Sequence, residues 1–129
     1  LRHRNHLGIM TGAPFVLTSS STTAIDFTSS SAFVHGTAAR KDINGTLLMW
    51  TGDAKRDGVV KYTGSANDRD PILVRVGGTT PNNSVQGYYT DDTNMDGVVK
   101  YTGSGNDRDG ILVNVGSTTP NNFRLEQLP

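Results

Sequence analysis

The sequence predicts a mainly β fold with short helices, in which a partial β-sandwich-like segment precedes a pair of acidic-loop and short-helix units. Short apolar runs separated by Gly, Ser and Thr fill residues 1–50, and a long internal repeat fills residues 51–129. The chain has 129 residues and no Cys. A chain of this size has a limited core, and without Cys it cannot form disulfides. Bound metal ions are the other common way to stabilise such a chain.

In the first fifty residues, short apolar runs alternate with turn-forming residues, a pattern that predicts strands and turns. Short apolar or alternating runs occur at residues 15–17, 25–27, 33–35 and 47–50. Residues 1–7 also alternate, starting as though a strand had been cut, and Leu1 in place of Met suggests a processed or partial chain. A sandwich needs about seven strands. We therefore expect an incomplete sandwich, or one that receives its missing edge from another chain.

The second part of the chain is a duplication. Residues 53–83 align with residues 92–122 at a constant offset of 39, and 24 of the 31 aligned positions are identical. Two copies of one supersecondary unit are therefore expected, joined by residues 84–91.

Each copy changes from a polar loop to an apolar segment with the spacing of a short helix. The apolar positions of the two segments are Ile72, Leu73 and Val76, and Ile111, Leu112 and Val115. Asn67 or Asp68 is a plausible N-cap of the first segment, and Gly77 and Gly116 are natural ends. The β-branched residues leave a short strand as the alternative.

The loop of the second copy has the pattern of a calcium-binding loop. Such a loop needs oxygen ligands at alternate positions, a Gly at the bend, a backbone carbonyl next and a late carboxylate. The residues expected to supply the first ligands are Asp92, Asn94 and Asp96 through side chains and Val98 through its carbonyl. The usual closing position is Gly103, so we expect Asp107 to close the loop, with Asn106 and Asp109 as alternatives.

The first copy has the same pattern with one substitution. Asp53, Asp57, the carbonyl of Val59 and Asp68 are its expected calcium ligands. Lys55 stands where the second copy has Asn94, and it brings a positive charge where an oxygen is needed. We expect two Ca²⁺ sites, the first weaker than the second, unless Lys55 turns into solvent and leaves the first loop usable.

The duplicated D-x-N-x-D-G-V-V loop followed by a short helix resembles the dockerin family. The resemblance implies a small antiparallel, dockerin-like unit of two calcium loops, each with a helix, and dockerins bind a cohesin partner. The K-Y-T-G-S-x-N-D-R-D form also looks like C-terminal regions of large secreted and cell-surface proteins of Bacteroidetes. There, R-H-R-N-H-L-G, here residues 2–8, tends to end a β-sandwich domain before the calcium unit.

Composition and motifs argue against several functions. Twelve basic and twelve acidic residues give no net charge, so no basic patch for nucleic acid is expected. No run of apolar residues is long enough to insert into a membrane, and no nucleophile motif or sugar-sized carboxylate pair points to an enzyme. His3 and His6 would point to opposite faces of a strand, which disfavours shared metal ligation.

The sequence thus favours a non-enzymatic, calcium-stabilised structural or assembly module of a secreted, extracellular bacterial surface protein, such as a filament or scaffold subunit. The expected partner is a second copy of the chain or a larger parent assembly that adds a strand to the edge at residues 1–7. The alternatives are docking onto a cohesin-like partner and a carbohydrate-binding or adhesion module. The last would stack glycans on Trp50, Tyr62, Tyr88, Tyr89 and Tyr101, which could equally pack the core.

Overall fold

The computed structural model describes residues 1–129 and shows small β-sheets with two short helices, which confirms the predicted fold class. Three antiparallel two-stranded sheets pair β1 (Arg40–Ile43) with β2 (Thr46–Met49), β3 (Val59–Lys61) with β6 (Phe123–Leu125), and β4 (Ser84–Gln86) with β5 (Val98–Lys100). The helices are α1 (Arg69–Arg75) and α2 (Asp107–Val115). Neither is long and apolar enough to cross a membrane.

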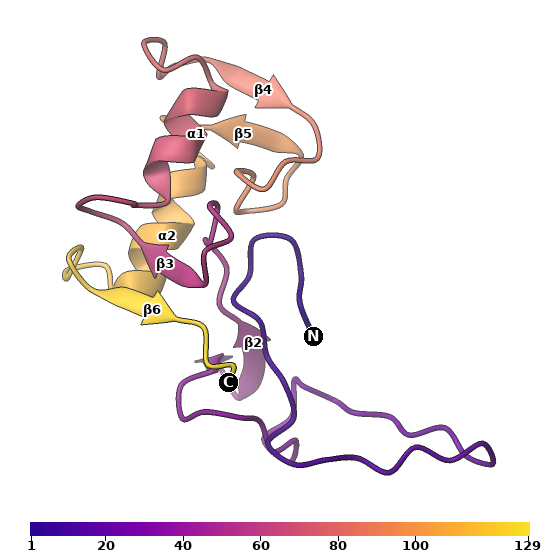
Figure 1. The fold of residues 1–129 in the computed structure, drawn as a ribbon. Helices are drawn as coiled ribbons and strands as arrows, with labels where there is room; N and C mark the ends of the chain where they lie inside the picture. The colour runs from indigo at the N-terminus through magenta and orange to yellow at the C-terminus, as the bar shows by residue number, and fades with distance from the viewer.

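The N-terminal segment contains a single hairpin, β1–β2. Of the predicted runs, only residues 47–50 contribute to a strand of this hairpin. Residues 33–35 contribute one isolated bridge, from Val34 to Thr11, and residues 15–17 and 25–27 lie in no strand. These Ser- and Thr-rich loops extend away from the helices (Figure 1). They have no second sheet to cover their apolar side chains, so the runs have nothing to pack against.

Residues 1–7 do not form the predicted edge strand. The His6 N–H donates to the His3 carbonyl at 2.8 Å, which makes a tight turn, and the only bridge joins His6 to Thr51. Asn5 and Leu7 are buried, so this segment packs inward. The edge that was expected to recruit a further strand is therefore absent.

Both apolar segments are helices, and an Asn side chain caps each one. The Asn67 Oδ1 accepts the N–H groups of Arg69 and Asp70 at 3.0 and 3.2 Å, whereas Asp68 makes no capping bond of this kind. The Asn106 Oδ1 caps α2 in the same way. Gly116 ends α2 with a φ of 121°, a value that L side chains rarely adopt.

The two repeats exchange strands. β3 of the first repeat pairs with β6, which follows the second helix, and β5 of the second repeat pairs with β4, which follows the first helix (Figure 1). Equivalent hydroxyls complete the exchange: Thr63 Oγ1 donates to the Pro120 carbonyl and Thr102 Oγ1 to the Pro81 carbonyl, both at 3.0 Å. Neither repeat can therefore complete its strand pairing without the other.

A small core lies between the helices and the loop strands. Its buried members are Leu7, Val60, Ile72, Val76, Val99, Ile111 and Val115. Six of the seven belong to the duplication, at equivalent positions of the two repeats, and Leu7 comes from the N-terminal segment. One residue from before the predicted division at residue 50 thus completes the core of the second part.

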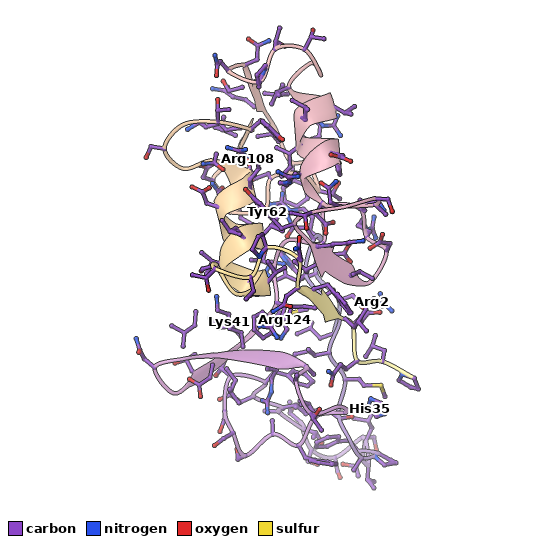
Figure 2. All side chains as sticks on the ribbon, turned by 90° about the vertical axis from the view of Figure 1, so that its left-hand side faces the viewer. Arg2, His35, Lys41, Tyr62, Arg108 and Arg124 are labelled. Carbon is purple, nitrogen blue, oxygen red and sulfur yellow. The ribbon has the colours of Figure 1, made fainter.

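Asn114 joins the hairpin to the helical unit. Its Oδ1 accepts Lys41 Nζ and its carbonyl accepts Arg124 Nε, both at 2.8 Å. The same two cations flank the Trp50 ring at 5.8 and 4.6 Å, between the hairpin and the helices (Figure 2). The equivalent residue of the first repeat is Arg75, so this junction exists only once.

Replacing Ile111 with Ala should lower the free energy of unfolding by roughly 2–4 kcal/mol, because the side chain is fully buried and would leave a cavity. Val113→Ala on the same helix is the matched control. Val113 is 55% exposed, so its replacement should change stability by less than about 0.5 kcal/mol. Urea unfolding of both variants tests this, and equal losses would contradict the assigned core.

Candidate functional site

The second loop brings its three predicted side-chain ligands onto one tight turn. The carboxylate of Asp92 accepts the N–H groups of Asp96 and Gly97 at 3.2 and 3.1 Å. Asn94 Oδ1 accepts the same Asp96 N–H at 2.9 Å, and Asp96 Oδ1 accepts the Val98 N–H at 2.9 Å. Gly97 bends the chain with a φ of 85°. The spacing read in the sequence therefore places these oxygens close together.

Asp107 is the carboxylate that closes this loop. It is fully buried; its Oδ1 accepts the N–H groups of Thr93 and Asn94 at 2.7 and 3.3 Å, and its Oδ2 accepts that of Lys100 at 2.8 Å. Asp109 is exposed, and its Oδ2 accepts only the amide of the helix cap, at 2.8 Å. Of the two carboxylates considered for this role, only that of Asp107 accepts N–H groups of the loop, and the third candidate, Asn106, caps α2.

The backbone N–H of Val98 is directed toward the loop, where it donates to Asp96. The Gly87 N–H donates to the Gly97 carbonyl at 3.0 Å, so the carbonyl of Gly97 points toward the chain at the end of β4. Backbone groups of successive residues alternate in direction along a strand. The polar groups of Val98 therefore point away from β4, as its N–H bond to the Asp96 carboxylate also shows.

Sequence reasoning missed one oxygen of this loop, the carbonyl of Gly105. The Asn94 side-chain amide donates to it at 2.9 Å and lies 3.3 Å from Asp96 Oδ2. A carbonyl ligand leaves no signature in residue type, because every residue has one. The only signal was the lengthened loop before Asp107, which folds back over the turn.

The first loop repeats this geometry. Asp53 Oδ1 accepts the Asp57 N–H at 3.0 Å, and Asp57 Oδ1 accepts the Val59 N–H at 3.2 Å. Asp68 is fully buried in the place of the second loop's closing carboxylate and accepts the Lys61 N–H at 2.7 Å. The structure therefore brings together all four residues predicted for this loop.

Lys55 is directed into the first loop. Its Nζ lies 2.8 Å from Asp57 Oδ2 and 3.3 Å from the Ala66 carbonyl. Its side chain is 30% exposed. An arrangement with Lys55 turned out into solvent is not the one in the structure, because the carboxylate and the carbonyl hold the ammonium group.

Burial disfavours the ionised forms of three loop carboxylates. Burial raises the pKa of Asp68 to about 7, and it also raises the pKa of Asp53 and of Asp107, although backbone N–H bonds oppose the effect in each. The hydrogen bond with Asp57 raises the pKa of Lys55. A positive charge near these carboxylates would favour their ionised forms.

Arg4 and Asn5 tie the two loops together. The buried Asn5 side-chain amide donates to the backbone carbonyls of Thr90 and Asp92 at 2.9 and 2.6 Å. The backbone carbonyl of Asn5 accepts the Asp53 N–H at 2.9 Å. Arg4 Nη2 lies 3.3 Å from Asp92 Oδ2. The first expected ligand of each loop is thus positioned from the N-terminal segment, a role that residue type alone did not indicate.

The three histidines are divided between two places in the structure. The prediction that His3 and His6 point apart is wrong, because the turn brings their Nδ1 atoms within 3.2 Å. His35 lies elsewhere and contacts the Gln127 carbonyl at 2.9 Å. No group of three or more His, Asp or Glu side chains is arranged to hold a metal ion.

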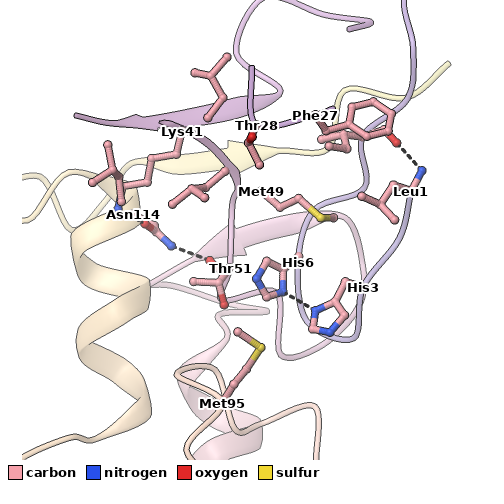
Figure 3. Close-up of a pocket in the computed structure, with 14 residues that line it drawn as sticks. Leu1, His3, His6, Phe27, Thr28, Lys41, Met49, Thr51, Met95 and Asn114 are labelled. Carbon is pink, nitrogen blue, oxygen red and sulfur yellow. Dashed lines mark hydrogen bonds between the residues drawn. The ribbon is translucent and has the colours of Figure 1, made fainter. Parts of the chain in front are cut away.

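A mostly apolar pocket of about 450 Å³ lies between the hairpin and the second loop (Figure 3). His3, His6 and Met95 are among its lining residues, and Lys41 reaches from the hairpin toward Asn114. The pocket is lined chiefly by hydrophobic side chains and does not gather the oxygen donors that a hard cation needs.

The aromatic rings are covered by guanidinium groups. Arg69 stacks on Tyr62 and Arg108 on Tyr101, at 4.5 and 4.3 Å from the ring centres. The remaining rings considered for glycan stacking, Tyr88, Tyr89 and Trp50, are covered in the same way by Arg4, Arg75 and Arg124. Each ring thus has a guanidinium group over one face, and Tyr88 nevertheless remains 79% exposed.

Taken together, the second loop can offer side-chain oxygens from three residues, two carbonyls and a buried carboxylate. Hard oxygen donors of this kind suit calcium rather than softer metals. No protein-family model, curated protein or solved structure matches this chain.

Asp107→Asn should lower the free energy of unfolding by roughly 1–3 kcal/mol, because the amide nitrogen that replaces one carboxylate oxygen cannot accept the backbone N–H bonded there. Asp109→Asn is the matched control and should cost less than about 1 kcal/mol, because its carboxylate is exposed. Urea unfolding measures both. Equal effects of the two substitutions would contradict the assignment of Asp107.

Acid should weaken the protein through His6. Burial lowers the pKa of His6 from 6.5 to about 4, so the unfolded chain binds its proton first and stability is lost as the pH falls from 6.5 to about 4. The raised pKa of Asp68 acts in the opposite direction. The comparison of the protein with its His6→Gln variant by urea unfolding between about pH 7 and pH 4.5 isolates the histidine. An identical pH dependence of stability in the two proteins would contradict the role assigned to His6.

Proposed function

We propose that this chain is a non-enzymatic, calcium-stabilised structural module that takes part in the assembly of a secreted bacterial surface protein. The observation that carries this proposal is the buried Asp107 carboxylate beside the oxygens of the second loop. A calcium ion there would join the loop to the start of α2, and so join the acidic turn to the core. The bacterial surface setting is supported by the resemblance in sequence described above.

The electrostatics of the loop support calcium binding. Three carboxylates, those of Asp92, Asp96 and Asp107, belong to one loop, and the burial of Asp107 disfavours its charged form. A divalent cation between these carboxylates would offset the repulsion among their negative charges. A cation that binds only the folded state stabilises that state by mass action. Calcium accepts the mixture of carboxylate, amide and carbonyl oxygens that this loop presents.

A structural role fits the carboxylates better than catalysis does. Asp53, Asp68, Asp92 and Asp107 each accept backbone N–H groups of their own loops. Groups engaged in this way hold the backbone and are not free to transfer protons to a substrate.

For assembly, the N-terminal loops offer the exposed apolar side chains. Val16 and Leu17 are each 81% exposed and Phe33 is 71% exposed. Apolar surface of this kind gains free energy when another chain covers it. A second copy of the chain or a neighbouring part of a parent assembly would serve, in place of strand addition at residues 1–7.

The melting temperature should rise by about 5–10 °C between excess chelator and about 10 mM calcium, as expected for the weak affinities of extracellular calcium modules. Asp96→Ala should remove most of this increase, and the equivalent Asp57→Ala should remove less. Calorimetric melting measures the shift, and light scattering of the same samples reports assembly. A melting temperature that ignores calcium would contradict the proposal.

A further inference from the structure

In the second loop, one side-chain amide bridges a carboxylate and a backbone carbonyl. The side-chain amide of Asn94 lies between Asp96 Oδ2, at 3.3 Å, and the Gly105 carbonyl, at 2.9 Å. The bridge joins the acidic turn to the lengthened part of the loop. Asn94 carries an oxygen as well as a nitrogen, so a cation could take over this bridge with Asn94 as a ligand.

The first loop contains the same bridge, made by a charged group. Lys55 is the residue equivalent to Asn94, and its Nζ lies 2.8 Å from Asp57 Oδ2 and 3.3 Å from the Ala66 carbonyl. These acceptors are the equivalents of those in the second loop. An ammonium group has three donors and no acceptor, so it satisfies both oxygens but cannot bind a cation.

We propose that the ammonium group of Lys55 takes the place of a metal ion in the first loop, so that only the second loop depends on calcium. The inference deepens the proposed function and rests on it for the second loop. It replaces the expectation of two Ca²⁺ sites with one calcium site and one internally balanced loop.

The charges of the two turns support this assignment. Residues 53–57 contain two Asp, one Lys and one Arg, and their formal charges sum to zero. Residues 92–96 contain two Asp and no basic residue, and their charge is −2, of which Arg4 offsets one unit from outside the turn through its ion pair with Asp92. The repeats differ within these turns only at the three central positions, two of which carry the added cations. A divalent ion in the first loop would meet the Lys55 ammonium beside the same oxygens, and the two charges would repel.

A mixed unit of this kind has a mechanical consequence. Because each repeat pairs its strand with the strand that follows the other, a first loop that stays closed can hold β3 and β6 when the second loop is empty. Removal of calcium should then open the second loop locally and leave the first closed.

The test uses the full chain, freed of metal, with calcium as the probe. Isothermal titration calorimetry counts the bound ions, and hydrogen exchange in chelator follows the Lys61 amide in the first loop and the Lys100 amide in the second. The variants are Lys55→Asn, which restores an oxygen; Asn94→Lys, which transplants the ammonium group; and Lys55→Met, which removes the charge while retaining the length of the side chain.

The unaltered protein should bind one calcium ion, and chelator should speed exchange at Lys100 by about tenfold or more while leaving Lys61 protected. Lys55→Asn should bind two ions. Asn94→Lys should bind none and keep Lys100 protected in chelator. Lys55→Met should speed exchange at Lys61 in chelator by about tenfold or more.

Two bound ions in the unaltered protein would overturn the inference and leave the proposed function intact. So would protection of Lys61 that does not change in Lys55→Met, because the ammonium group would then hold nothing. Conversely, the unaltered protein could bind no calcium while the protection of its Lys61 amide from exchange is still lost in Lys55→Met. That result would refute the calcium role of the second loop and support the role proposed for Lys55.

Discussion

Burial of one carboxylate at the start of each helix is the constraint on which the rest of the unit depends. Asp68 and Asp107 are fully buried and accept N–H groups from both sides of their loops. Each carboxylate therefore fastens an acidic turn, a strand and a helix at one point. A charge withdrawn from water in this way needs compensation, which N–H groups give only in part. Positive charge near each loop would thus stabilise the ionised form of its buried carboxylate.

The exchange of strands makes the two loops mechanically dependent. The strand of each repeat is completed by the segment that follows the other helix, and equivalent threonines close both junctions. The thin core between them contains six residues from the repeats and Leu7 from the N-terminal segment. A cation bound in one loop would consequently stabilise packing that both repeats share.

The differences between the repeats explain how a symmetric unit serves an asymmetric molecule. Asn114 replaces the Arg75 of the first repeat and docks the hairpin through Lys41 and Arg124. Lys55 replaces Asn94 and brings its charge into the loop. Each substitution uses a position that the duplication leaves equivalent, so the two halves share a backbone while the second repeat alone both docks the hairpin and retains an oxygen-bearing side chain at every position predicted to supply a side-chain ligand.

The sequence by itself determined the duplication, both helices and the acidic turns, because these depend on local spacing: a ligand at alternate positions, a Gly at the bend and apolar residues on one side of a helix. It also distinguished Lys55 from Asn94. Only the tertiary structure decided how the repeats exchange strands, that the Gly105 carbonyl joins the loop, and that residues 1–7 turn inward instead of forming an edge. These features depend on contacts between distant residues, and alternation in a short polar segment does not specify a strand unless a neighbour buries one of its faces.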